Sequence, residues 1–153
     1  MTVKLSTGLR NAMAGLVGFA GAINGGVIEV YTGPQPLTAD AAPTGTLLGR
    51  ATLNGAAWNA GDPTNGLVLD AATGGGVAKP SGATWKLVGL AAGNAGWFRF
   101  RANAVDDGSV STTLVRIDGA IAVGGGDAKF STVAITVGQP VTIDVFSFSI
   151  PAQ

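Results

Sequence analysis

Residues Gly96-Trp97-Phe98-Arg99-Phe100-Arg101-Ala102-Asn103-Ala104 decide the fold class, because bulky apolar and polar side chains alternate along them. Side chains of a β-strand point alternately to its two faces. One face therefore carries Phe98, Phe100, Ala102 and Ala104, and the other carries Trp97, Arg99, Arg101 and Asn103. The first face predicts a packed core. The second predicts a surface that stacks on and hydrogen-bonds to a partner.

This stretch lies past the middle of the chain, so we expect a central strand with a neighbour on each side. Seven further stretches have the apolar runs or the alternation of strands: residues 26–33, 47–53, 67–71, 83–90, 111–123, 130–137 and 141–150. Glycine-rich turns separate them, and 25 of the 153 residues are glycine. The pattern predicts an all-β, single-domain antiparallel β-sandwich, jelly-roll-like, of about eight strands.

The first 25 residues are different, and we expect an N-terminal arm (1–25) with a short helix ahead of a β-sandwich domain (26–153). Between Leu5 and Ile23, apolar residues recur at three- and four-residue spacing, with Ser6 or Thr7 as the N-cap. Several glycines weaken this helix, so it needs a surface to lie on. The alternative is a secretory signal, with cleavage at Ala20-Gly21-Ala22.

The charge content limits the possible partners. Charged residues make up 12% of the chain, against about 25% in a typical soluble domain, and nine basic residues balance nine acidic ones. No net field directs such a protein to nucleic acid or to an anionic membrane, so we expect neither as a partner. A surface so poor in charge suits a subunit that other subunits partly cover; a small protein with a Thr/Ser/Asn surface is the alternative.

The residue types argue against an enzyme. Cysteine and histidine are absent, which excludes zinc sites of the usual kind, thiol nucleophiles and histidine-based triads. Glu29, Asp118 and Asp144 lie in predicted strands and could meet as a glycosidase pair, but most acidic residues lie in turns. We therefore predict no catalytic residue.

No motif predicts a cofactor or a metal. Residues 106–108 (Asp-Asp-Gly) and 124–127 (Gly-Gly-Gly-Asp) faintly resemble calcium loops but lack the EF-hand spacing, and turn chemistry explains both. The Asp-Gly of the first predicts a hairpin-type turn. Residues 74–79 lack the spacing of a phosphate-binding loop.

Arginine and tryptophan supply the remaining candidate contacts. Arg99, Arg101 and Arg116 form a basic stripe if their strands pair, and we expect them to bind Asp106, Asp107 and Asp118 or a neighbouring subunit. Trp58, in the polar loop 56–66, is the best contact candidate among the three tryptophans. The proline-bearing loop 34–46 and the N-terminal segment are expected to become ordered only in an assembly. The predicted partner interface comprises Leu9, Arg10, Met13, Leu16, Pro34, Pro36, Pro43, Trp58, Trp97, Arg99 and Arg101.

Several short stretches resemble small structural proteins encoded in tailed-bacteriophage genomes. They are Leu5-Ser6-Thr7-Gly8-Leu9-Arg10-Asn11, residues 30–36 (VYTGPQP), residues 39–48 (ADAAPTGTLL), Gly96-Trp97-Phe98-Arg99 and Arg116-Ile117-Asp118-Gly119. The resemblance runs over most of the chain, and no functional residue is carried over from it.

The resemblance implies a virion component, most specifically a capsid decoration (cement) protein. Such a protein is a small β-sandwich on the outer surface of the phage head that bridges major capsid subunits. The implied partners are the major capsid protein and further copies of this chain, as a dimer or trimer. A tail or baseplate subunit is the alternative within this class. A secreted carbohydrate-binding or adhesin module, which would use exposed tryptophans on glycans, is the alternative from another class.

Overall fold

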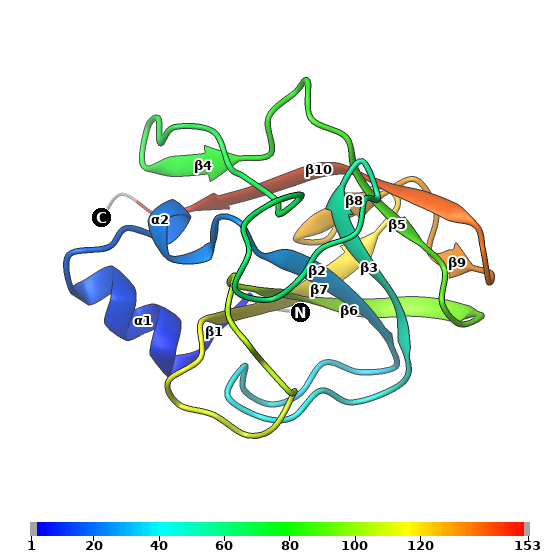
Figure 1. Ribbon diagram of the computed structural model, residues 1–153, viewed down its shortest axis with the longest axis horizontal. Coiled ribbons are helices and arrows are strands. Elements are labelled where there is room, and N and C mark those ends of the chain that lie inside the picture. The colour runs from blue at the N-terminus through cyan, green and yellow to red at the C-terminus, as the bar shows by residue number, and fades with distance from the viewer. Residues whose placement is uncertain (1–2, 152–153) are drawn as a thin grey trace.

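The computed structural model describes residues 3–151, and strands dominate it, with 38% strand and 9% helix. The predicted all-β class is therefore confirmed. The helices are α1 (Thr7–Ala14) and α2 (Phe19–Ile23). The strands are β1 (Lys4–Leu5), β2 (Val27–Thr32), β3 (Leu47–Leu53), β4 (Gly76–Ala78), β5 (Trp85–Val88), β6 (Gly93–Arg101), β7 (Arg116–Ala122), β8 (Ala128–Phe130), β9 (Ala134–Ile135) and β10 (Pro140–Ser149) (Figure 1).

Seven strands close into a barrel in the order β6–β7–β8–β10–β5–β3–β2 and back to β6. Neighbours are antiparallel except for β7 and β8, which are parallel. The strands close into a barrel where a sandwich was predicted, because β7 pairs with β6 on one side and β8 on the other. That pairing joins what would otherwise be the free edges of two sheets.

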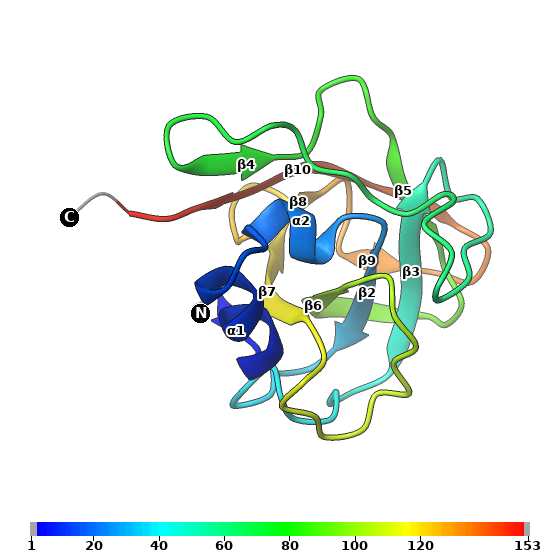
Figure 2. The same cartoon turned by 60° about the vertical axis from the view of Figure 1, so that its left-hand side comes forward.

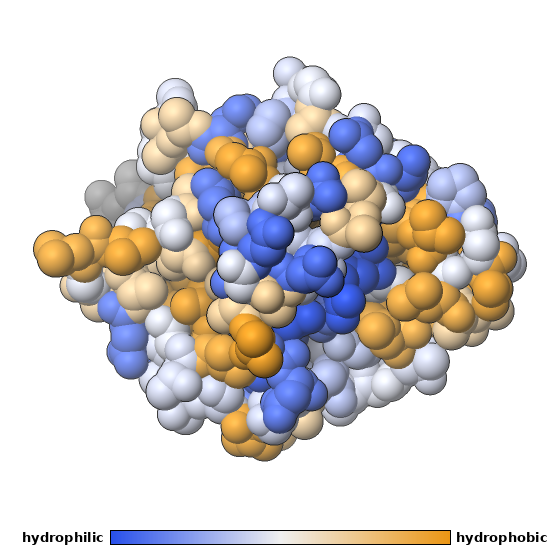
Figure 3. Space-filling model, viewed as in Figure 1, coloured by the Kyte–Doolittle hydropathy of each residue, from blue (hydrophilic) through white to orange (hydrophobic). Residues whose placement is uncertain are grey.

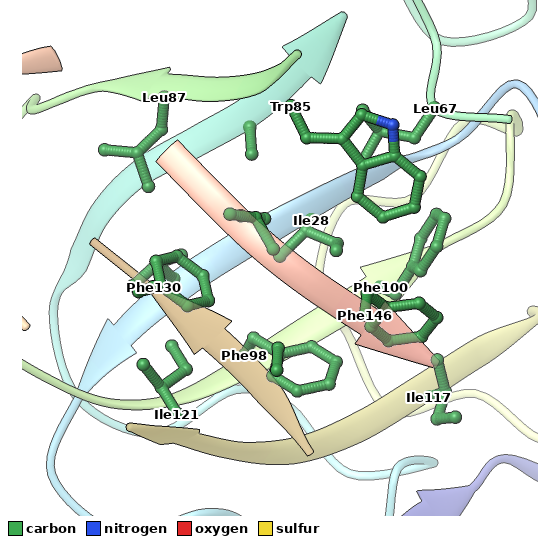
Figure 4. Close-up of a cluster of buried hydrophobic side chains, with 14 of the residues drawn as sticks. Ile28, Leu67, Trp85, Leu87, Phe98, Phe100, Ile117, Ile121, Phe130 and Phe146 are labelled. Carbon is green, nitrogen blue, oxygen red and sulfur yellow. The ribbon is translucent and has the colours of Figure 1, made fainter. Parts of the chain in front are cut away.

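The barrel interior holds the apolar side chains that alternation assigned to one face of β6. Phe98 and Phe100 are fully buried there, and both contact Phe146 of β10 edge-to-face. Trp85 of β5 packs edge-on against Phe100 with ring centroids 5.9 Å apart. Figure 4 shows these rings meeting aliphatic side chains from the surrounding strands. Aromatic contacts across the interior thus hold the walls of the barrel together.

β6 is a central strand, as predicted, with β2 and β7 as its neighbours. The connection to β7 is not the predicted hairpin-type turn. β6 ends at Arg101 and β7 begins at Arg116, so a long loop joins them. Asp106 does form a local turn in this loop, since its Oδ1 accepts from the Gly108 N–H and Gly108 has a positive φ of 81°. This turn therefore shapes the loop and does not connect β6 directly to β7. Arg101 and Arg116 of the sheet hold the loop through its carbonyl groups.

The described part of the predicted arm packs on the barrel instead of extending away from it. Ser6 caps α1 by accepting from the Leu9 N–H at 3.1 Å, as one of the two expected caps. The helical pattern divides into α1 and α2, with glycines at both ends of the break. Leu9 and Ile23 are fully buried, and β1 pairs with β7. Residues 1–2 of the arm and 152–153 of the predicted domain lie outside the described residues.

Two strand predictions and one turn prediction fail for non-local reasons. Residues 67–71 form no strand, only a bridge from Leu67 to Gly26. Residues 130–137 contain only the last residue of β8 and the whole of β9, and these two strands pair with different partners. Residues 76–78, which read as a glycine-rich turn, form β4 because they pair with the end of β10. Pairing partners distant in sequence decide each case.

Candidate functional site

The outer face of β2, β6 and β7 carries charged side chains that are nevertheless buried. Arg99, Arg101, Arg116 and Asp118 are exposed by 1%, 5%, 0% and 0%, respectively. We call this group the outer-face network; its members are Glu29, Arg50, Arg99, Arg101, Asp106, Arg116 and Asp118. Buried charges are stable only when they are paired, so the contacts within the network determine which of these side chains remain available to a ligand.

Arg99 and Asp118 form its most buried pair. They lie directly opposite each other on β6 and β7, with Nε–Oδ1 and Nη2–Oδ2 distances of 2.7 and 2.8 Å. Burial raises the pKa of Asp118, and the Arg99 hydrogen bonds counteract that rise. Burial works against the charge on Arg99, yet its hydrogen bonds to Asp118, together with nearby negative charge, above all that of Asp118, outweigh it and raise the pKa of the guanidinium. The remaining Nη1 of Arg99 donates to the carbonyl of Ala41 at 3.0 Å, which fastens loop 34–46 to the sheet.

The Glu29 carboxylate on β2 contacts two guanidiniums and accepts a hydrogen bond from a phenol. Arg50 Nη2 and Arg101 Nε lie 2.7 and 3.1 Å from its Oε1. The Tyr31 hydroxyl donates to Oε2 at 2.9 Å. Burial, followed by the negative charge of Glu29, raises the pKa of Tyr31 above its ordinary range. Tyr31 is therefore held as a neutral donor, and Glu29 has no oxygen free for general base work.

Arg101 and Arg116 lie directly opposite each other, a repulsive arrangement that Asp106 relieves. The Asp106 carboxylate accepts from Arg116 Nε at 2.7 Å, and its backbone carbonyl accepts from Arg101 Nη1 at 3.0 Å. Burial opposes the charge on Asp106, but the hydrogen bonds from Arg116 and the Gly108 N–H, together with the positive charges of Arg116 and Arg101, outweigh it and lower the pKa of the carboxyl. One aspartate thus anchors the long 102–115 loop over two like charges.

The prediction that Trp97, Arg99 and Arg101 form a partner surface is wrong. Trp97 is fully buried and stacks on Tyr31 with ring centroids 4.7 Å apart. The physical reason is that the two loops fold over this face and supply oxygen atoms to its guanidiniums, although the buried Arg101 Nε and Arg116 Nη1 make no hydrogen bond within residues 3–151. The alternative expectation, pairing with Asp106 and Asp118, is confirmed. Asp107 instead faces solvent and accepts from the Ser109 N–H.

Loop 34–46 was expected to become ordered only in an assembly, but the chain itself anchors it. The Asp40 carboxylate accepts from the N–H and hydroxyl of Thr7, both at 2.7 Å, at the start of α1. Lys4 Nζ donates to the carbonyl of Pro36. Of the three prolines predicted at an interface, Pro36 is buried, Pro43 is half-buried and Pro34 is exposed. Only Pro34 is presented fully at the surface.

Trp58 is half-buried, and its indole is used within the chain. Its Nε1 donates to the carbonyl of Gly25 at 2.8 Å. The Arg50 and Arg101 guanidiniums lie 6.0 and 5.3 Å from its ring centroids. A hollow of about 290 Å³ borders it, lined in part by Arg50 and Leu90. The ring extends the outer-face network and presents only part of its surface to a ligand.

The acidic residues weighed for catalysis and metal binding are already engaged in contacts within the chain. Arginines hold Glu29 and Asp118, and the exposed Asp144 accepts from its neighbour Thr142 Oγ1 at 2.8 Å. The Asp127 carboxylate accepts from the Ala120 N–H. Within residues 3–151, no three His, Cys, Asp or Glu side chains cluster as a metal site would require.

Apolar side chains are exposed to water where α1 and α2 face β4 and the end of β10. We call this region the apolar end. Leu16, Val17 and Ile150 are 105%, 45% and 58% exposed. Figure 3 shows apolar side chains gathered on the side where Figure 1 places the two helices. A cavity of about 300 Å³ opens between α2 and the β4–β10 pair, and Phe148 stacks on Phe19 at its wall, with centroids 4.1 Å apart.

The predicted helix contacts divide between interior and surface. Leu9 is fully buried in the core, so it is not available to a partner, because it faces the barrel. Met13 is half-buried, whereas Arg10 and Leu16 are exposed. Sequence reasoning missed Phe148 and Ile150. The signal was present, since a charge-free strand end with alternating apolar residues is uncommon at a solvated edge.

Comparisons of the chain with protein-family models, with curated proteins and with solved structures gave no match. Among residues 3–151, neither helix is long and apolar enough to cross a membrane.

Proposed function

We propose that this protein is a non-enzymatic structural subunit of a tailed-phage virion, most specifically a decoration protein of the head that binds the major capsid protein. The observation that carries the structural role is the apolar end, where large aliphatic side chains are exposed on a chain that has few charges. The virion assignment draws on the sequence resemblance described above.

The two regions support a docking role in complementary ways. The outer-face network fixes both long loops to the barrel, so the scaffold needs no partner to order it. The apolar end leaves side chains such as Leu16 and Ile150 in water. Burying one such side chain contributes about 1.5–3 kcal/mol, so contact with a neighbouring subunit through this end is favourable.

The test is to locate the chain. An antibody raised against the purified protein is used to label tailed particles from a culture of its source, and the particles are viewed by electron microscopy. Label on the heads supports decoration, and label on the tail supports the tail or baseplate alternative. Particles without label, in a preparation whose soluble fraction contains the chain, contradict the virion role.

A secreted carbohydrate-binding module is the candidate from another class, and the hollow beside Trp58 is the observation that favours it. Secretory cleavage after Ala22 would, however, remove Leu9 and Phe19 from the core and β1 from its pairing with β7. The mass of the mature chain distinguishes the two: a chain that retains residues 3–22 contradicts secretion by this signal.

A further inference from the structure

The wall of the barrel contains a slit beside the end of β10. Two strands pair with the same side of β7. β1 pairs with residues 117 and 118 of β7, and β8 pairs with residues 121 and 122. β10 pairs with β8 as far as Phe146 and then continues past it, without pairing with β1. A hollow of about 490 Å³ lies between them, lined by Val3, Leu5, Met13, Phe148, Ser149, Ile150 and Pro151. Figures 1 and 2 show this end of β10 and β4 projecting beyond the barrel.

Among residues 3–151, the end of β10 is paired along one edge and open along the other. Phe146 accepts from the Lys79 N–H at 2.9 Å, and the Ile150 N–H donates to Gly75 at 2.9 Å, so the even-numbered residues bond toward β4 and its turn. In an antiparallel ladder, the residues between them direct their N–H and C=O groups to the other side. Ser147 and Ser149 therefore present backbone donors and acceptors to the slit.

This open edge carries no charged side chain, and charge is one of the features that normally block strand addition; Pro151 ends it and a register shift between Ile143 and Val145 precedes it. Residues 145–151 (Val-Phe-Ser-Phe-Ser-Ile-Pro) contain no charged side chain, and Ile150 is 58% exposed. Natural edge strands usually carry charges, bulges or covering loops, since an unblocked edge pairs with other chains. The backbone groups between the register shift and Pro151 are therefore available for pairing with a further strand.

We propose that the occupant is a second copy of this chain, joined by antiparallel pairing of the two β10 ends about a two-fold axis at Ser149. The sequence is self-complementary in this register. Phe148 of each copy lies opposite Ile150 of the other on one face, and the two Ser149 residues meet on the other face. Ser147 lies opposite Pro151, whose carbonyl accepts although its nitrogen cannot donate. The contact covers Ile150 and closes as a dimer.

This inference deepens the proposed function by naming the surface for self-association, and it rests on that function only for its biological purpose. Failure to dimerise would leave head binding by a single copy intact, and failure to label virions would leave the dimer intact. The two outcomes are therefore distinguishable.

Single cysteines provide the sharpest test, because the native chain has none. In Ser149→Cys the two sulfurs face each other across the axis, within the Cα separation of about 4.4–6.8 Å that a disulfide requires. In the control, Ser147→Cys, each sulfur faces Pro151 of the other copy. Under mild oxidation at matched concentration, we expect Ser149→Cys to form covalent dimer at least about tenfold faster. Equal rates would overturn the proposal.

A second pair of variants tests the backbone bonds. Ser149→Pro removes the N–H that points to the slit and leaves the β4 side intact, whereas Ser149→Ala keeps it. By sedimentation velocity up to about 1 mM protein, we expect wild type and Ser149→Ala to dimerise and Ser149→Pro to associate at least tenfold more weakly. A monomeric wild type, or a folded Ser149→Pro that dimerises as tightly as Ser149→Ala, would overturn the proposal.

Discussion

The outer-face network and the apolar end reverse the usual relation between polarity and burial. Arg99 and Asp118 are charged and lie out of water, whereas Leu16 and Ile150 are aliphatic and lie in it. Charge on a strand face predicts solvent, and aliphatic residues predict a core. In each region, burial depends on which parts of the folded chain cover the side chain and not on the type of residue.

The difference lies in where the partner of each region comes from. The chain supplies the oxygen atoms for its own guanidiniums through β7, loop 34–46 and loop 102–115. It supplies only part of a cover for the end of β10, through β4 and Phe19. The first region is therefore a closed structural clamp, whereas the second leaves apolar surface exposed, which is why we propose it as the docking surface.

The largest expected effect follows from breaking the most buried ion pair. Asp118→Ala leaves Arg99 buried without its carboxylate, so we expect the free energy of unfolding to fall by about 3–5 kcal/mol. Asp144→Ala, at an exposed position of β10, should change it by less than about 0.5 kcal/mol. Urea denaturation measures both. Equal losses would contradict a closed clamp.

Acid should weaken the same clamp through Asp106. The pKa of this carboxyl is lower in the folded chain than its ordinary 3.8, so its contribution is present above that pH and is lost as pH falls through the folded value. At neutral pH, we expect Asp106→Asn to cost roughly 1.5–3 kcal/mol through the Arg116 contact. The difference from wild type should shrink below about pH 4. A difference that is constant with pH would show that the charge is not responsible.

A smaller effect is expected for Gly8→Ala in α1. Helix propensity alone predicts that this change stabilises the fold, but we expect it to lower the free energy of unfolding. A Cβ at Gly8 would lie 2.3 Å from the Thr113 carbonyl oxygen, because α1 packs directly on the loop before β7. Crowding costs about 1–3 kcal/mol and the propensity gain returns about 1, so Gly8→Ala should destabilise by up to roughly 2 kcal/mol. Gly21→Ala, in α2, meets only the Val17 side chain and serves as the control. Thermal unfolding that ranks Gly8→Ala above wild type would contradict this packing.

The smallest effect on folding is expected at the apolar end. Ile150→Ser should alter the free energy of unfolding by less than about 0.5 kcal/mol, since the side chain is largely in water already. Ile143→Ser, the same change in the buried part of β10, should cost several-fold more. A large loss at Ile150 would mean that the chain itself already uses this side chain.

The features that the sequence predicted correctly are local. Alternation along residues 96–104 identified β6 and its core face, and Ser6 was one of the two expected caps. The pairing of Arg99 and Arg116 with nearby acids was one of the two roles expected for these arginines, and it is confirmed. Barrel closure did not follow, because it depends on the pairing of β7 with β8, which no local pattern encodes.

The burial of Trp97, Arg99 and Arg101 was also beyond local reasoning. A strand face with an indole and two guanidiniums looks the same whether a partner or the chain's own loops cover it. The decisive contacts come from Ala41 and Asp106, in loops without periodicity. β4 was missed for the same reason, since only the end of β10 makes its three residues a strand.

Amide hydrogen exchange of the native chain, at low and at high protein concentration, tests the contrast between the two regions most directly. We expect the Phe100 amide, inside the closed barrel wall, to exchange slowly at both concentrations. The Ser149 amide, on the open edge, should exchange quickly in dilute solution and slow down as the copies pair. An amide at Ser149 that is equally fast at both concentrations, or one at Phe100 that becomes slow only when concentrated, would contradict the account.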